Sequence, residues 1–209
     1  MALDVGERAP LAAATLQRLG FPPNRAMYRA GVHAEGTCFY HSLAYALNDH
    51  DYHRHSDESK RSIGHNLRRR VQRALQRTSV EAWRAFWAER GVNNPPPVRQ
   101  IRKEIGEVST WADIWAIEFT MHALGTNVLF FDLAEPPRMY CGVGDWRYPT
   151  TVLVAWVDGA HFEPIVEERE GGAHAVSHFA TDDPLIRHVK RGFGRACQNV
   201  TLRDVVART

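Results

Sequence analysis

The chain has 209 residues, of which 44% are apolar and 10% aromatic, enough to bury the core of one globular domain. Its 26 basic and 24 acidic residues leave a formal net charge of +2, so no global field favours nucleic acid or an anionic membrane. No stretch approaches the roughly 18 apolar residues of a membrane span, and three scattered cysteines without a C-x-x-C pair argue against a disulfide framework or a thiolate zinc site.

Two helices are predicted in the first quarter of the chain. Residues 9–19 place Pro10 at a first helical turn, and Gly20 follows the last turn. Residues 38–47 follow the stretch "EGT" and repeat their apolar side chains at helical spacing. A helix is therefore expected to begin at Cys38.

A helical arm is predicted over residues 61–91. Its first helix begins near Ile63 and has an apolar face and a basic face, the basic residues being Arg68, Arg69, Arg70, Arg73 and Arg77. Its second helix has Ser79 as a cap and Gly91 as a stop, and it carries a buried stripe formed by Trp83, Phe86 and Trp87. The stretch "NNPPP" ends the arm.

The second half of the chain predicts a small sheet. A helix over Thr110–Leu124 leads into a fully apolar strand at Val128–Phe131. Two β-rich runs, residues 150–157 and 160–168, are joined by Asp158-Gly159, the composition of a tight hairpin turn.

The end of the chain carries weaker signals. Residues 171–184 predict a loop, and residues 199–209 predict a modest amphipathic helix. The expected fold class is therefore α+β, with helices packed on a small central sheet and a helical arm between the two segments that carry chemistry.

Cys38 lies where a thiol can act as a nucleophile. A helix N-terminus lowers a thiol pKa because its unpaired N–H groups present partial positive charge. Gly36 allows a tight turn just before the helix, and the amides around Thr37 and Cys38 are expected to form an oxyanion hole.

His161 is the expected proton acceptor for this thiol. It opens the second strand of the predicted hairpin, where a side chain is held rigidly and faces a cleft. Glu163 follows two residues later, so its side chain leaves the strand on the same face and is placed to orient the imidazole.

Three blocks of the sequence together resemble the ovarian tumour (OTU) family of cysteine proteases. "EGTCFYHSL" resembles the family's Asp-Gly-x-Cys-x-Phe-x-Ser signature, and "GAHFEPIV" resembles its histidine block. "TWADIWAIEFTMHALGTNVLFF", between them, is similar to the family's tryptophan-led helix and apolar strand. The blocks follow the family's order and span about residues 31–166.

The resemblance implies a papain-like OTU fold in a single domain over residues 1–209. It implies a thiol protease that removes ubiquitin, or a ubiquitin-like modifier, from proteins or chains through a thioester intermediate. No metal or organic cofactor is expected. The expected partner is ubiquitin or polyubiquitin, with no nucleic acid and no membrane. The protein is expected to be a monomer. Its expected location is the cytoplasm, or the host cytoplasm if the protein is viral or bacterial.

The resemblance also implies roles for individual residues. Cys38 would be the nucleophile, His161 the base and then the acid, and Glu163 the orienting residue. Trp111 and Phe162 would form walls of a cleft narrow enough for a tail that ends in two glycines.

Two positions depart from the family's pattern. Glu35 stands three residues before the cysteine, where the family usually has Asp. Glu163 stands where the family usually has Asn or Asp, so Glu35 is kept as another candidate for the third catalytic residue.

Several plainer interpretations remain open. Cys141 and Cys197 are expected to be packing residues. His178 is the rival of His161, since "SHFATDD" also places acids after His-Phe. His41 is expected to be a packed or surface residue. A metal site could be built from four histidines, although a solvated loop is favoured, the four being His50, His53, His55 and His65.

Two other function classes remain open as well. The chain could be a ubiquitin-binding module on a decayed protease scaffold, given Glu35 and Glu163. The arginine run of the helical arm could bind nucleic acid, although a solvated helix face is favoured, and the same arm could contact a bound ubiquitin.

Overall fold

A computed structural model describes residues 1–47, 52, 54–134, 138–141, 147–169 and 175–196. The helices are α1 (Ala13–Arg18), α2 (Cys38–Leu47), α4 (Asp57–Arg77), α5 (Val80–Ala88), α6 (Val98–Gly106), α7 (Ile114–Leu124) and α8 (Pro184–Ala196). The strands are β1 (Arg8–Pro10), β2 (Ala26–Ala30), β3 (Thr126–Asp132), β4 (Arg138–Cys141), β5 (Thr150–Val157), β6 (His161–Glu168), β7 (Ala175–Val176) and β8 (His178–Ala180).

The strands form one sheet in the order β1-β2-β6-β5-β3-β4, with β7 paired to β6 and β8 paired to β5. Only the β3–β5 pair is parallel among the described strands, and the other pairs are antiparallel. The central strands β5 and β6 are joined by Asp158 and Gly159, which both have positive φ, 53° and 68°. This backbone matches the predicted tight hairpin, and it fixes where β6 begins.

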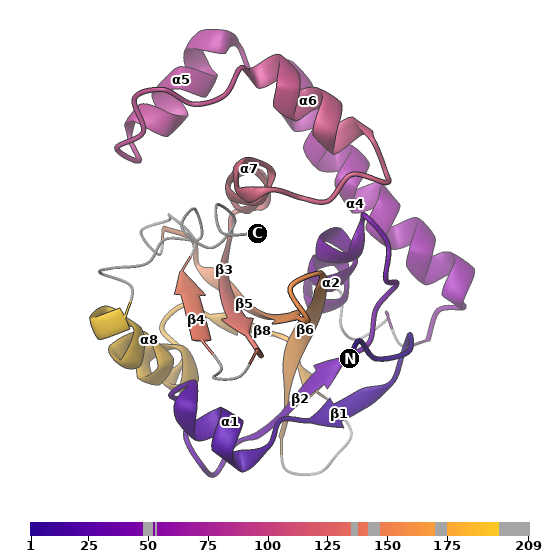
Figure 1. Cartoon of the computed structure of the whole chain (residues 1–209), viewed down its shortest axis with the longest axis vertical. Helices are drawn as coiled ribbons and strands as arrows, with labels where there is room; N and C mark the ends of the chain where they lie inside the picture. The colour runs from indigo at the N-terminus through magenta and orange to yellow at the C-terminus, as the bar shows by residue number, and fades with distance from the viewer. Residues whose placement is uncertain (48–51, 53, 135–137, 142–146, 170–174, 197–209) are drawn as a thin grey trace.

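Both faces of the sheet are covered, because alternate side chains of a strand point to opposite faces. One core combines the sheet with α2, α4, α5, α6 and α7, and its strand residues include Val128, Phe130, Val152 and Val154. The other core combines it with α1 and α8, and its strand residues include Leu129, Phe131, Leu153 and Ala155. Figure 1 shows α4, α5 and α6 as an arc that surrounds α7 on the first of these faces.

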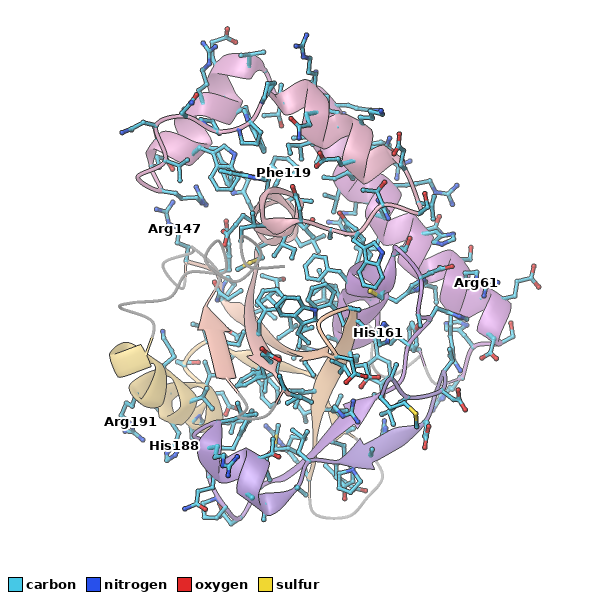
Figure 2. All side chains as sticks on the ribbon, in the orientation of Figure 1. Arg61, Phe119, Arg147, His161, His188 and Arg191 are labelled. Atoms are coloured by element: carbon cyan, nitrogen blue, oxygen red, sulfur yellow. The ribbon has the colours of Figure 1, made fainter. Side chains whose placement is uncertain are left out.

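The helical arm packs through aromatic side chains. Phe119 of α7 lies 6.0 Å from Trp83 and 6.1 Å from Phe86 of α5, measured between ring centroids. Figure 2 shows Phe119 projecting from α7 on the side of the arm. Ser79 caps α5 by accepting from the Ala82 amide, as predicted from the sequence.

The α+β class, the helix that begins at Cys38 and the 150–168 hairpin are confirmed. The predicted first helix was partly wrong, because Pro10 lies in β1, where edge pairing with Tyr28 of β2 needs no amide hydrogen from it. Residues 175–180, predicted as loop, form two short strands on the edges of β6 and β5. The amphipathic helix predicted over 199–209 lies outside the described residues.

No helix among the described residues combines the length and hydropathy that crossing a membrane requires.

Candidate active site

Cys38 occupies the first position of α2 and lies against the start of β6. The Phe162 backbone hydrogen-bonds to its thiol, and Ser42, one turn further along α2, donates to the carbonyl oxygens of Cys38 at 3.0 Å and of Phe162 at 2.8 Å. These bonds join the N-terminal turn of α2 to the strand that begins with His161. Residues 120 positions apart in the sequence therefore meet at one place.

The thiol is covered in this structure, with Cys38 only 1% exposed. Burial raises its pKa to about 11, although hydrogen bonds from the backbone of Phe162 and Phe39 act in the opposite direction. The sequence predicts an ionised thiol facing an open groove, and the structure corrects this expectation: desolvation outweighs the field of the helix N-terminus.

His161 is also buried, at 5% exposure, and neither of its ring nitrogens has a hydrogen-bond partner in the described part of the chain. Burial, followed by the positive charge of Arg29, lowers its pKa. The imidazole is therefore neutral at pH 7, which is the form that can accept a proton.

Glu163 lies on the same face of β6 as His161, but it is bound elsewhere. Its Oε1 is 3.8 Å from His161 Nε2, beyond hydrogen-bond distance. The Leu3 amide donates to Oε1 at 2.7 Å, and Arg29 Nη1 donates to Oε2 at 2.8 Å. Burial raises the pKa of this carboxyl, with Arg29 and the Leu3 amide acting against it.

Glu35, the other candidate for the third catalytic residue, contacts different histidines. His41 Nε2 donates to its Oε1 at 2.8 Å, and His65 Nε2 donates to the same oxygen at 2.9 Å. His41 is fully buried, and desolvation lowers its pKa to about 4. This cluster holds the residue that precedes Gly36, and no hydrogen bond of the described residues joins it to the ring of His161.

The same three residues are the group of possible metal ligands among the described residues, with ligand atoms within 4.8 Å of one another. Both imidazoles donate to one carboxylate oxygen at ordinary hydrogen-bond distances, so the cluster is satisfied as it stands. A metal-bound histidine usually donates its second N–H to an acceptor, but His41 Nδ1 has none and lies against Gly64. The geometry therefore fits a hydrogen-bonded cluster better than a metal site. Of the predicted loop set, His65 takes part and His55 does not, and His50 and His53 lie outside the described residues.

The loop before Cys38 is tightly packed. A Cβ on Gly36 would lie 2.5 Å from the Ser109 carbonyl, so only glycine fits at this position. The Cys38 amide donates to the Glu35 carbonyl at 2.8 Å, and the Thr37 hydroxyl donates to the Val108 carbonyl at 3.2 Å. Cys38 is one of the three residues predicted to form the oxyanion hole. In this structure its amide is hydrogen-bonded within the loop itself.

Arg68 is a residue of this site that sequence reasoning missed. It was placed on a solvated face of the arm, but it is 3% exposed, and its guanidinium donates to the Gly36 carbonyl and the Thr37 hydroxyl. A signal was present, since Arg68 follows Gly64 by four residues and precedes Val71 by three on the buried stripe of α4. The other arginines of the run, Arg69, Arg70, Arg73 and Arg77, are exposed.

The two predicted cleft walls lie in different surroundings. Trp111 is 45% exposed and follows the segment that packs on Gly36. Phe162 is buried and packs against the rings of Phe39 at 5.5 Å and Phe130 at 5.9 Å. Trp111 is therefore free to meet a partner, whereas Phe162 belongs to the core beneath the site.

His178 lies at the other end of α2. Its Nδ1 is 3.0 Å from the carbonyl oxygen of Ala46, near the C-terminus of that helix. Cys38 is eight residues away along the same helix, which corresponds to about 12 Å. The position favours His161 over His178 as the partner of the thiol.

No protein-family model matches the chain, and no curated protein sequence matches it. Its structure is similar to solved OTU structures. An OTU domain in complex with ubiquitin has a TM-score of 0.53 and 15% identity, covering 80% of this chain and 82% of that one. A complex of h/ceOTUB1 with ubiquitin aldehyde and UBCH5B~Ub gives 0.53 and 15%, with 78% and 90% covered. A ceOTUB1 complex with ubiquitin aldehyde and UBC13~Ub gives 0.54 and 14%, with 78% and 93% covered. The chain therefore has an OTU-domain fold.

Proposed function

We propose that this OTU-fold chain is a cysteine deubiquitinase that hydrolyses the bond after the C-terminal glycine of ubiquitin or a ubiquitin-like modifier. The observation that carries the proposal is the junction of α2 and β6. There the Phe162 backbone hydrogen-bonds to the Cys38 thiol, and the preceding residue, His161, is neutral with no hydrogen-bond partner for its ring nitrogens among the described residues. The similar OTU domains solved with ubiquitin support ubiquitin as the partner.

The proposed reaction begins when His161 takes the thiol proton of Cys38 and the sulfur attacks the carbonyl carbon of the modifier's last glycine. The amides of Gly36 and Thr37 stabilise the resulting oxyanion. The C–N bond then breaks, and the imidazolium gives its proton to the departing lysine amine. A water molecule loses a proton to His161 and attacks the thioester, which releases the modifier's carboxyl group and restores the thiol.

The reaction requires that the cover over Cys38 opens when substrate binds, because the sulfur is almost fully buried. The segment proposed to move is the Val108–Ser109 backbone, which packs on Gly36, two residues before Cys38. Trp111 follows it and is exposed, so a ubiquitin tail that contacts this tryptophan would also contact the segment that must move.

Hydrolysis of a fluorogenic ubiquitin C-terminal amide tests the proposal. We expect Cys38→Ala to abolish turnover, His161→Gln to reduce kcat by about 10²- to 10⁴-fold, and Glu163→Gln to reduce it less. His178→Gln is the matched control, a histidine of the neighbouring strand β8 that should leave the rate unchanged. Turnover that survives in Cys38→Ala would contradict the proposal.

A second function has a specific observation in its favour. The raised pKa of Cys38 and the missing hydrogen bond between His161 and Glu163 would suit a ubiquitin-binding module without activity. In that case the wild type would bind ubiquitin as tightly as Cys38→Ala does, and neither protein would hydrolyse the fluorogenic substrate.

A further inference from the structure

The buried guanidinium of Arg68 makes an unusual set of contacts. Its nitrogens carry five N–H hydrogens and lie 2.5 to 3.2 Å from seven acceptor oxygens, so some of the hydrogens are shared between two acceptors. Six acceptors are backbone carbonyls and one is a hydroxyl, and they belong to Gly36, Thr37, Glu104, Ile105, Glu107, Val108 and Thr110. All three of its nitrogens are used. One side chain thus joins the loop before Cys38, the C-terminal end of α6 and the segment that leads to α7.

This cation has no ionic partner within the described part of the chain, since no carboxylate lies within 4.0 Å of its nitrogens. The ring of Tyr40 also lies near it, 5.3 Å from the guanidinium carbon. Burying a charge costs free energy. Satisfying carbonyl groups with a charged side chain therefore costs more than satisfying them with a neutral donor. The end of α6 requires only part of this hydrogen bonding, and two of the acceptors belong to the loop of the proposed active site.

The bond to Gly36 fixes the direction of the next amide. A trans peptide unit is planar, and its C=O and N–H point in opposite directions. Because the Gly36 carbonyl points at Arg68, the Thr37 N–H points away from it. The Thr37 hydroxyl is held as well, since it accepts from Arg68 at 3.2 Å and donates to Val108. The loop therefore has one orientation as long as the guanidinium is in place.

We propose that Arg68 is a positioning residue for the oxyanion loop, acting through the peptide plane of Gly36 and Thr37. This inference rests on the proposed hydrolase function and deepens it. The charge is also close enough for Arg68 and a Cys38 thiolate to stabilise each other. Since the same guanidinium binds α6 and residues 107–110, movement of the helical arm is transmitted to the loop.

The decisive variant is Arg68→Lys, which keeps the charge but has only one nitrogen and cannot bridge these acceptors. Arg102→Lys is the matched control: Arg102 also caps a helix end, donating to the Leu75 and Thr78 carbonyls, but it does not contact the Gly36–Thr37 loop. With the fluorogenic ubiquitin amide, we expect Arg68→Lys to lower kcat by about 10²-fold at unchanged KM, and Arg102→Lys to lower stability without lowering kcat. A folded Arg68→Lys protein with wild-type kcat would overturn the proposal.

A second readout does not depend on activity. Hydrogen exchange of the residue 36–38 amides should be faster in Arg68→Lys than in the wild type and unchanged in Arg102→Lys. If the wild type does not hydrolyse the substrate, the proposed function fails, and this exchange still decides whether Arg68 positions the loop; unchanged exchange in Arg68→Lys would reject it.

If Arg68→Lys does not fold, Thr37 gives the same test. Thr37→Val removes the hydroxyl that Arg68 and Val108 share, whereas Thr37→Ser retains it. We expect kcat to fall in Thr37→Val and to recover in Thr37→Ser. Equal kcat in both variants and the wild type would overturn the proposal.

Discussion

Burial decides the protonation state of the two residues proposed to react. Raising the pKa of a thiol from about 9 to about 11 corresponds to about 2 to 3 kcal/mol, more than the roughly 0.3 to 1 kcal/mol that a helix N-terminus supplies at an exposed site. Desolvation therefore has the larger effect on the pKa of Cys38. His161 is neutral for the same reason, so at rest the structure holds a neutral thiol and a neutral imidazole.

Alkylation of Cys38 in the free protein should therefore be slow and steeply dependent on pH. With a pKa of about 11, only about one thiol in ten thousand is ionised at pH 7, and the rate should rise about tenfold per pH unit up to pH 10. Iodoacetamide labelling followed by peptide mass spectrometry measures this rate, and the urea-unfolded chain is the control. A rate at Cys38 that is already constant from pH 7 to pH 9 would show that the thiol is ionised and exposed.

At the scale of elements, the site depends on where α2 and β6 begin, and short sequence signals predicted both starts. The stretch "EGT" before an apolar helix placed Cys38, and Asp158-Gly159 placed His161. Strand β1 was missed because three residues carry too little pattern and it forms only by pairing with β2. Helix α6 was missed although Val98, Ile101 and Ile105 have helical spacing, since the three prolines before it were taken as a plain break.

The β5–β6 turn gives a prediction about this element. Gly159 has a φ of 68°, so Gly159→Ala should lower the free energy of unfolding by about 1 kcal/mol, because a Cβ is strained in the left-handed region. Asp158→Asn is the matched control, since Asn tolerates the φ of 53° found there. Urea unfolding measures both. Equal stability of Gly159→Ala and the wild type would mean that the turn has another backbone conformation.

At the scale of the whole molecule, the site combines segments from most of the described chain. The partners of Glu163 are Leu3 and Arg29, those of Glu35 are His41 and His65, and Arg68 reaches Gly36 from the helical arm. The sequence indicated which residues are candidates for the chemistry, because motif residues are local. It could not predict their partners, because these contacts depend on how the elements pack.

The central claim is that Cys38 becomes accessible and reactive when ubiquitin is bound. The most direct measurement is covalent labelling with ubiquitin that carries a C-terminal electrophile, with the modified residue identified by mass spectrometry. The account predicts a single adduct at Cys38, absent in Cys38→Ala and strongly slowed in His161→Gln. No adduct in the wild type, or an adduct at Cys141 or Cys197 instead, would contradict it.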